Sequence, residues 1–197
     1  MTTWFETPDS DNGDNQKSKE TPLDRLLKSR TIVICSEISQ KLAKEVCEKL
    51  LFLANESDDD IKLFIHSQGG HVESGDTIHD MIRYVKPRVR MIGTGWVASA
   101  GALIFVAAEK EDRFCLPNTR FLLHQPSGGV RGQATDIGIE AQEIVKMRRR
   151  LNEIFARQTG QPIETIEKQT DRNFWMSPEE AKAYGLVHKI IESPDAL

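Results

Sequence analysis

The chain has 197 residues, of which 39% are hydrophobic and 28% charged, and its formal net charge at pH 7 is -4. This length and composition are typical of one soluble globular domain with its own core. Without a basic stripe, nucleic acid is not expected as a partner. No apolar run reaches the roughly 18 residues that cross a bilayer, and the N-terminus lacks a signal-peptide pattern. We therefore expect a cytoplasmic protein that does not enter a membrane.

The cysteines point to the same compartment. Cys35, Cys47 and Cys115 are odd in number, are scattered through apolar runs and form no CxxC pair. This pattern favours buried free thiols in a reducing environment over a disulfide framework or a zinc site.

The first half of the chain alternates between strand-like and helix-like segments. Residues 1–20 are acidic and polar and are predicted to be a disordered tail, so that the folded domain spans 21–197. Thr21-Pro22 predicts the start of a first helix. Strands are predicted at 31–35, 61–66 and 89–95, and helices between them at 39–54 and 73–85. This alternation predicts an α/β fold with a largely parallel sheet and helices packed outside it.

The second half has a different organisation. Residues 127–133 are rich in glycine, and a helix of about 25 residues is predicted from near residue 135 to Thr159. A helix of this length, preceded by glycines, is expected to project from the body and to be covered by another copy of the chain. A capping box at Ser177-Pro178-Glu179-Glu180 opens the last helix, which ends at Gly185. Residues 186–191 predict a closing strand.

One serine and one histidine are placed where chemistry is expected. Ser99 follows a predicted strand and precedes an apolar helix, and His124 ends a short apolar strand at 121–124. A serine needs a nearby base to act as a nucleophile, and sites in open α/β sheets lie beyond the carboxyl ends of strands. The alternative is that Ser99 only caps a helix and His124 is one of five ordinary histidines.

Two glycines at a third strand end add hydrogen-bond donors. Gly69 and Gly70 carry no side chain, so their N–H groups could lie close to a substrate. The N–H of Ala100, at a helix start, would be a second donor beside Ser99. No Gly-Lys-Ser/Thr follows the glycines, so this is not a phosphate-binding Walker loop. A simple tight turn is the alternative interpretation.

Five motifs, taken together, resemble the ClpP family, the proteolytic subunits of Clp protease. In chain order they are Ser-x-Gly-Gly at 67–70, Ala-Ser-x-Gly-Ala at 98–102, RFCLPNTRFLLHQP at 113–126, GQATDI at 132–137 and MSPEEAKAYGLV at 176–187. The resemblance covers about residues 22–191. It implies a ClpP/crotonase-like fold with a protruding handle helix within about 127–160. It also implies a tetradecamer of two seven-membered rings that enclose a proteolytic chamber.

The resemblance implies partners and cofactors as well. An AAA+ unfoldase is expected to feed unfolded proteins into the chamber. ATP would be used by that unfoldase, so this chain is expected to bind no cofactor and no metal. The rings are expected to be homo-oligomeric, or mixed with a second ClpP subunit.

Residue roles also follow from the resemblance. Ser99 would be the nucleophile, His124 the general base, and Gly70 and Ala100 the donors of the oxyanion N–H groups. The third catalytic position, an aspartate in the family, is occupied here by Asn173.

The same segment holds a second pair of interest. Asp171 and Arg172 align with residues that make the contact between rings in the family. Asp171 is also the nearest carboxylate that could substitute for the missing aspartate by a local shift.

These considerations leave three hypotheses. The first is a Clp-type serine endopeptidase that degrades unfolded proteins to short peptides. Its activity is expected to be weak, because an amide at Asn173 can orient the imidazole but cannot neutralise the imidazolium. The second is a low-activity structural or regulatory paralogue that assembles mixed rings with an active subunit. The third, a crotonase-like enzyme acting on a coenzyme A thioester, is disfavoured by the Ser–His pair.

Overall fold

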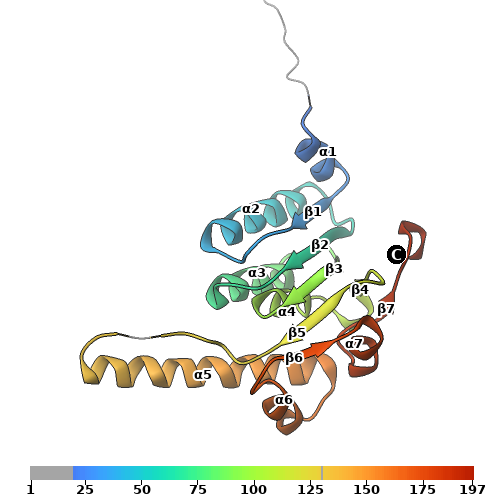
Figure 1. Cartoon of the computed structure of the whole chain (residues 1–197). Helices are drawn as coiled ribbons and strands as arrows, with labels where there is room; N and C mark the ends of the chain where they lie inside the picture. The colour runs from blue at the N-terminus through green and yellow to red at the C-terminus, as the bar shows by residue number, and fades with distance from the viewer. Residues whose placement is uncertain (1–19, 130) are drawn as a thin grey trace, which may run out of the picture.

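The computed structural model describes residues 20–129 and 131–197. The predicted tail, apart from Glu20, therefore lies outside the described residues. The described part begins with α1 (Pro22–Lys28), β1 (Thr31–Ile34), α2 (Gln40–Glu56), β2 (Ile61–Ser67), α3 (Val72–Tyr84) and β3 (Val89–Ala98) (Figure 1). Next come α4 (Ala100–Phe105), the short 3-10 helix η1 (Lys110–Asp112), β4 (Arg113–Cys115) and β5 (Arg120–Leu123).

The remaining elements are α5 (Ala134–Thr159), α6 (Ile163–Gln169), β6 (Phe174–Met176), α7 (Pro178–Tyr184), β7 (Lys189–Ile190) and η2 (Pro194–Ala196). The predicted helix boundaries agree with the observed caps. Thr21 and Ser177 both form capping boxes, and Gly160 and Gly185 end their helices in the left-handed conformation.

The strands of the described residues form one sheet of seven, in the order β1-β2-β3-β4-β7, with β5 paired to β3 and β6 paired to β5. All pairings are parallel except β5 with β6, which confirms the predicted α/β fold with a largely parallel sheet. Strand β3 changes its neighbour along its length. Met91–Gly93 pairs with β4, and Trp96–Ala98 pairs with β5.

Helix α4 lies at the centre of the molecule. Each of its six residues is buried, and it packs against α3 and the sheet. Small residues make this packing close. A Cβ on Gly101 would lie 3.2 Å from the Ser67 carbonyl oxygen, and one on Gly75 would lie 3.2 Å from the Ala100 Cβ. The start of α4 is therefore held against the end of β2.

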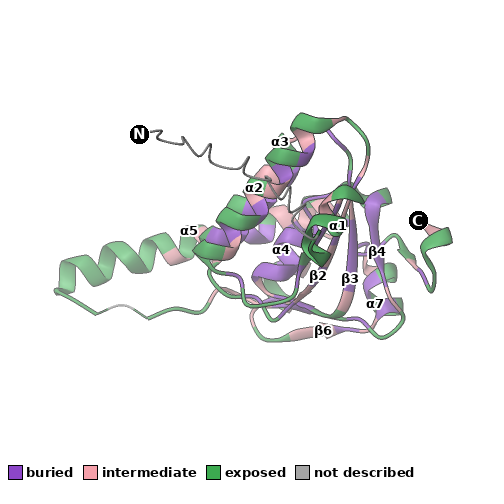
Figure 2. Cartoon of the chain, turned by 90° about the horizontal axis from the view of Figure 1, so that it is seen from above, coloured by how far each residue is buried: buried purple, intermediate pink, exposed green. Residues whose placement is uncertain are grey.

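Helix α5 has two different halves. Its C-terminal half packs on the body through Leu151 and Phe155, whereas its N-terminal half projects away and is exposed (Figure 2). The predicted protruding helix is confirmed. Among the described residues, no helix is long and apolar enough to cross a membrane.

Some details of the sequence-based prediction are wrong. Of the three cysteines expected to be buried, only Cys115 is; Cys47 is half-buried, and Cys35 is exposed because it follows the last residue of the edge strand β1. The closing strand is only Lys189–Ile190, within the predicted 186–191. The strand predicted to end at His124 ends at Leu123, which leaves His124 as the first residue beyond the sheet.

Candidate active site

Ser99 occupies the turn between β3 and α4. Its backbone has φ 56° and ψ -122°, a conformation that residues other than glycine rarely adopt. The Ser99 N–H donates to the carbonyl oxygen of Leu122 on β5, at 2.9 Å. The Ser99 side chain stands at the N-cap position of α4 but makes no capping hydrogen bond there. The helix-cap interpretation therefore does not account for this hydroxyl.

His124 lies beside the same turn. Ser99 and His124 line one small pocket at the carboxyl ends of β3 and β5. Within the described residues the two side chains are not joined by a hydrogen bond. His124 is half-buried, and desolvation lowers the pKa of its imidazole below the ordinary 6.5. The ring is therefore neutral at pH 7, the form in which it can accept a proton.

The turn after β2 packs directly onto the serine. Gly69 and Gly70 have φ values of 99° and 146°. A Cβ on Gly69 would lie only 2.5 Å from the Ser99 Cβ, so a side chain does not fit there. Ile38 anchors the turn, because its N–H donates to the Gly69 carbonyl at 2.8 Å and its carbonyl accepts from the His71 N–H at 2.9 Å.

Two backbone donors remain available, one next to Ser99 in the chain and one in the glycine turn that packs on it. Among the described residues, the N–H groups of Gly70 and Ala100 have no hydrogen-bond acceptor. Ala100 is the first residue of α4, where the helix dipole also favours negative charge. These two amides have the chemistry required to stabilise an oxyanion.

Asn173 lies at the edge of this arrangement. Strands β5 and β6 pair antiparallel, Phe121 with Met176, Leu122 with Trp175 and Leu123 with Phe174. The next position of that register sets Asn173 beside His124. The Asn173 side chain is exposed and has no hydrogen bond among the described residues.

Asp171 is engaged elsewhere. Its carboxylate forms ion pairs with Arg148 of α5 at 3.1 Å and with Arg172 at 2.9 Å. The Gln125 side chain donates to the Asp171 carbonyl at 2.8 Å, which ties the segment after β5 to the one before β6. Substitution of Asp171 for the missing aspartate therefore has no support in the geometry.

The pocket has an apolar wall that the sequence did not reveal. Besides Ser99 and His124 it is lined by Val72, Ala100, Leu103, Leu123, Pro126, Leu151 and Phe155. These come from α3, α4, α5 and the end of β5, and each was consistent with ordinary core packing. The signal available from the sequence was the apolar stripe on the long helix. It did not show that part of this stripe faces a pocket.

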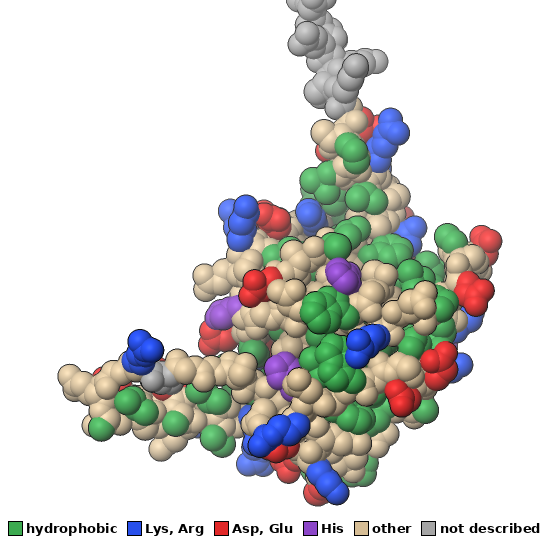
Figure 3. Space-filling view, in the orientation of Figure 1, with side chains coloured by type: hydrophobic (Ala, Val, Ile, Leu, Met, Phe, Trp, Pro, Cys, Tyr) green, Lys and Arg blue, Asp and Glu red, His purple; other side chains and the backbone are tan. Residues whose placement is uncertain are grey.

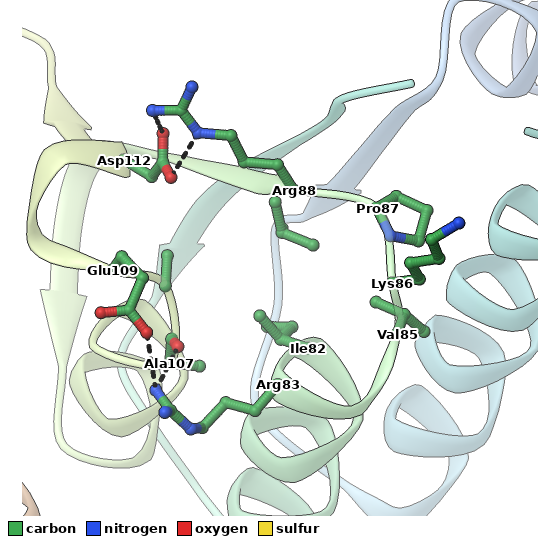
Figure 4. A pocket seen from close by; sticks show the side chains of 11 residues that line it. Ile82, Arg83, Val85, Lys86, Pro87, Arg88, Ala107, Glu109 and Asp112 are labelled. Atoms are coloured by element: carbon green, nitrogen blue, oxygen red, sulfur yellow. Dashed lines mark hydrogen bonds and ion pairs between the residues drawn. The ribbon is translucent and has the colours of Figure 1, made fainter. Parts of the chain in front are cut away.

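A second pocket lies at the other end of β3 (Figure 4). Four of its charged side chains pair with one another, Arg88 with Asp112 at 2.6 Å and Arg83 with Glu109 at 3.6 Å, and Lys86 pairs with Asp58 outside the pocket. It is lined by neither serine nor histidine. Among the described residues, no group of three or more His, Cys, Asp and Glu is placed to hold a metal ion.

Comparison with known proteins identifies the class. A family model described as Clp protease matches residues 14–194, so the chain belongs to the Clp protease family, a family of peptidases. The chain is 62% identical over 189 residues to the ATP-dependent Clp protease proteolytic subunit 3 of Rhizobium meliloti (strain 1021), covering 92% of this chain and 97% of that one. It is 56% identical over 167 residues to proteolytic subunit 2 of Pseudomonas aeruginosa, covering 85% and 83%.

Solved structures give the same result. ClpP1 from Listeria monocytogenes superimposes with a TM-score of 0.81 at 55% identity, covering 89% of this chain and 98% of that one. An asparagine-to-aspartate mutant of that protein gives 0.82 at 56% identity, covering 87% and 96%. The predicted ClpP fold is therefore confirmed.

Proposed function

We propose that this chain is a serine-type endopeptidase subunit that cuts unfolded polypeptides into short peptides. The observation that supports this most directly is that one pocket is lined by a hydroxyl without a capping role, an imidazole and the unused Ala100 amide, while the turn that holds the unused Gly70 amide packs on Ser99 through Gly69. These groups come from the ends of three parallel strands, β2, β3 and β5.

Each residue then has a defined task. His124 takes the proton of the Ser99 hydroxyl as its oxygen attacks the peptide carbonyl, and the N–H groups of Gly70 and Ala100 stabilise the resulting oxyanion. His124 next gives the proton to the leaving amine, and Ser99 is left as an acyl ester. Water, activated by His124, hydrolyses that ester and restores the serine.

We propose that the apolar wall of this narrow pocket contacts one substrate side chain. Leu103, Leu123, Leu151 and Phe155 offer no polar side-chain group. We propose that the residue preceding the cut bond is apolar, because burying a charged side chain there without a partner would be costly.

The finer features of the assembly also belong to this proposal. Exposed apolar side chains on α1, α2 and α5 support an oligomer, for which we retain the tetradecamer of two rings. Asp171 and Arg172 remain the residues proposed for the contact between rings. The names of the relatives include "ATP-dependent", which supports an ATPase partner of the AAA+ class and an ATP requirement outside this chain.

Two observations support the second hypothesis, the low-activity subunit of mixed rings. Asn173 has no charge to stabilise the imidazolium, and the Ser99 and His124 side chains are not hydrogen-bonded to each other in the single chain. A low-activity subunit that works in mixed rings would have these properties.

The decisive experiment labels the nucleophile. The purified protein should react with a fluorophosphonate probe and hydrolyse a small fluorogenic peptide, and Ser99→Ala should lose both reactions. Ser193→Ala, at an exposed serine remote from the pocket, is the matched control. Labelling that survives Ser99→Ala would contradict the assignment.

Activity that emerges only after mixing with a second ClpP subunit would favour the mixed-ring alternative. Repeating the mixture with Ser99→Ala then shows which subunit cuts. Loss of the emergent activity would assign the cutting to this chain, whereas undiminished activity would assign it to the other subunit.

A further inference from the structure

Four side chains form a row across the strands that carry the active site. They are His66 on β2, Trp96 on β3, Arg120 on β5 and Trp175 on β6. The ring centroids of His66 and Trp96 are 6.4 Å apart, those of Trp96 and Trp175 are also 6.4 Å apart with the planes only 8° from parallel, and the Arg120 guanidinium lies 4.3 Å from the Trp175 ring centre. We refer to these four residues as the aromatic row.

Each member lies on a strand that ends shortly before, or begins directly after, a site residue. β2 leads into Gly69 and Gly70, β3 into Ser99, and β5 into His124. β6 begins directly after Asn173. The row therefore ties together the four segments whose relative placement determines the geometry of the site.

His66 also holds an irregularity in β3. Ile65 pairs with Gly93 and Ser67 pairs with Val97, so three residues of β3 lie opposite the single residue His66. The His66 Nδ1 lies 3.2 Å from the Trp96 backbone nitrogen and 3.3 Å from the Thr94 carbonyl oxygen, so it accepts from the Trp96 N–H in one ring tautomer and donates to the Thr94 carbonyl in the other. Gly95, at φ 58°, leaves room for the ring, since a Cβ there would lie 2.4 Å from the His66 Nδ1. These contacts define a bulge that closes around an imidazole.

The bulge falls where β3 changes its neighbour. Before it, Met91–Gly93 pairs with β4, and after it Trp96–Ala98 pairs with β5, the strand that ends at His124. The Ser99 N–H then donates to Leu122 on the same strand. A change of register at the bulge would move Ser99 relative to His124, and misplacement by about 1 Å can cost two orders of magnitude in rate.

We propose that His66, through the β3 bulge and the aromatic row, is a positioning residue that sets Ser99 against His124. This rests on the proposed serine peptidase function. His66 does not line the pocket, so its effect passes through the backbone of β3. In this role His66 has the tautomer whose Nδ1 accepts from the Trp96 N–H, and the aromatic row holds the ring in place.

The test replaces the acceptor and then restores it. His66→Leu has a similar size but accepts no hydrogen bond, whereas the amide oxygen of His66→Asn can accept from the Trp96 N–H. We expect His66→Leu to lower both the kcat for a fluorogenic peptide and the fluorophosphonate labelling rate by at least about ten-fold, with KM changed by less than about two-fold. His66→Asn should recover most of the loss. Oligomer mass is measured for every variant.

Circular dichroism reports directly on the stacking of the two tryptophans in the aromatic row. The chain has three tryptophans, and two of them are stacked here, so their coupled indoles should give a paired band in circular dichroism. Trp175→Phe supplies the reference spectrum without that band. We expect the band to weaken in His66→Leu and to persist in His66→Asn.

The outcomes separate the two proposals. A wild-type protein that the probe does not label would refute the serine peptidase function and this role with it. A labelled wild type with an equally fast His66→Leu variant, or with His66→Asn no better than His66→Leu, would refute only the positioning role.

If His66→Leu does not assemble, Arg120→Gln tests the same row. It removes the guanidinium that lies over Trp175, and it changes an exposed side chain. We expect a fall of about three-fold in labelling against Arg157→Gln as control. Equal rates would count against the proposal.

Discussion

His124 and Asn173 occupy neighbouring positions at the ends of two antiparallel strands, and neither side chain has a hydrogen bond among the described residues. An imidazole in this setting lacks a partner that fixes its orientation or stabilises its charged form. In a serine protease whose aspartate was replaced by asparagine, that loss cost about 10⁴-fold in kcat. Under the proposed serine mechanism, the chemistry of this pair sets the expected rate.

Asn173→Asp should raise kcat by at least about ten-fold, because a carboxylate beside His124 stabilises the imidazolium that forms during attack. Steady-state kinetics with a fluorogenic peptide provides the measurement. Asn118→Asp adds the same charge in an exposed turn away from the pocket and should leave kcat unchanged. An unaltered rate in a correctly assembled Asn173→Asp protein would show that the third position is not limiting.

The pH dependence of the wild-type enzyme follows from the desolvation of His124. Its pKa is lowered from 6.5, so the ring stays neutral, and able to act as a base, to a lower pH than an exposed histidine would. We expect kcat/KM to be level at neutral pH and to fall on acidification only below about pH 6.5. In Asn173→Asp the added negative charge raises the pKa, so the acid limb should move to higher pH. A profile measured from about pH 5 to about pH 8 checks both statements.

The sequence predicted the positions of those site residues that directly follow strand ends. Ser99, His124 and the two glycines follow strand ends, and parallel strands bring such ends together. The close packing of Gly69 on Ser99 depends on a tertiary contact and could not be predicted. The apolar wall also depends on tertiary contacts. From the sequence alone, Leu103 and Phe155 are indistinguishable from other apolar core residues.

At the scale of elements, the helices were easier to predict than the short strands. Periodicity and caps predicted α2, α3, α5 and α7 to within a few residues. Strand β4 has three residues and begins with Arg113, a buried arginine whose guanidinium donates to the carbonyls of Ala108 and Gln158. A charged residue at the start of so short a strand gives no apolar pattern. Strand β6 is equally short and depends on its pairing with β5.

Helix α5 carries the clearest evidence for assembly at this scale. Ile137, Ile139 and Val145, on its projecting half, are exposed in the single chain. An isolated helix with this much apolar surface gains stability when another copy covers it. The helix is therefore expected to lie in an interface between protomers.

Ile139→Asp should weaken that interface, because the carboxylate would have to be buried without a partner. We expect the mass measured by light scattering to shift from the complete assembly toward half of it. Gln142→Asp introduces the same charge at an exposed polar position of the same helix, and should shift the mass less. If both variants keep the wild-type mass, the projecting half of α5 is not buried on assembly.

At the scale of the whole molecule, apolar surface is spread over several regions. Figure 3 shows hydrophobic side chains over α1, along α5 and at the centre of the sheet face seen in that view. The exposed set includes Leu23, Leu26, Leu51 and Phe52 on α1 and α2. A chain with contacts on several sides suits a closed, multi-subunit assembly better than a simple dimer.

The left-handed backbone at Ser99 has a consequence for folding as well as for chemistry. A side chain held at φ 56° and ψ -122° costs of the order of 1–3 kcal/mol, which the surrounding structure must offset. Glycine adopts such angles freely, whereas alanine retains the strain. Two catalytically dead proteins should therefore differ in heat resistance. At equal protomer concentration, Ser99→Gly should melt at a higher temperature than Ser99→Ala, with the active chain close to the latter. At the proposed nucleophile, thermal stability could then be increased only by a substitution that abolishes peptide cleavage.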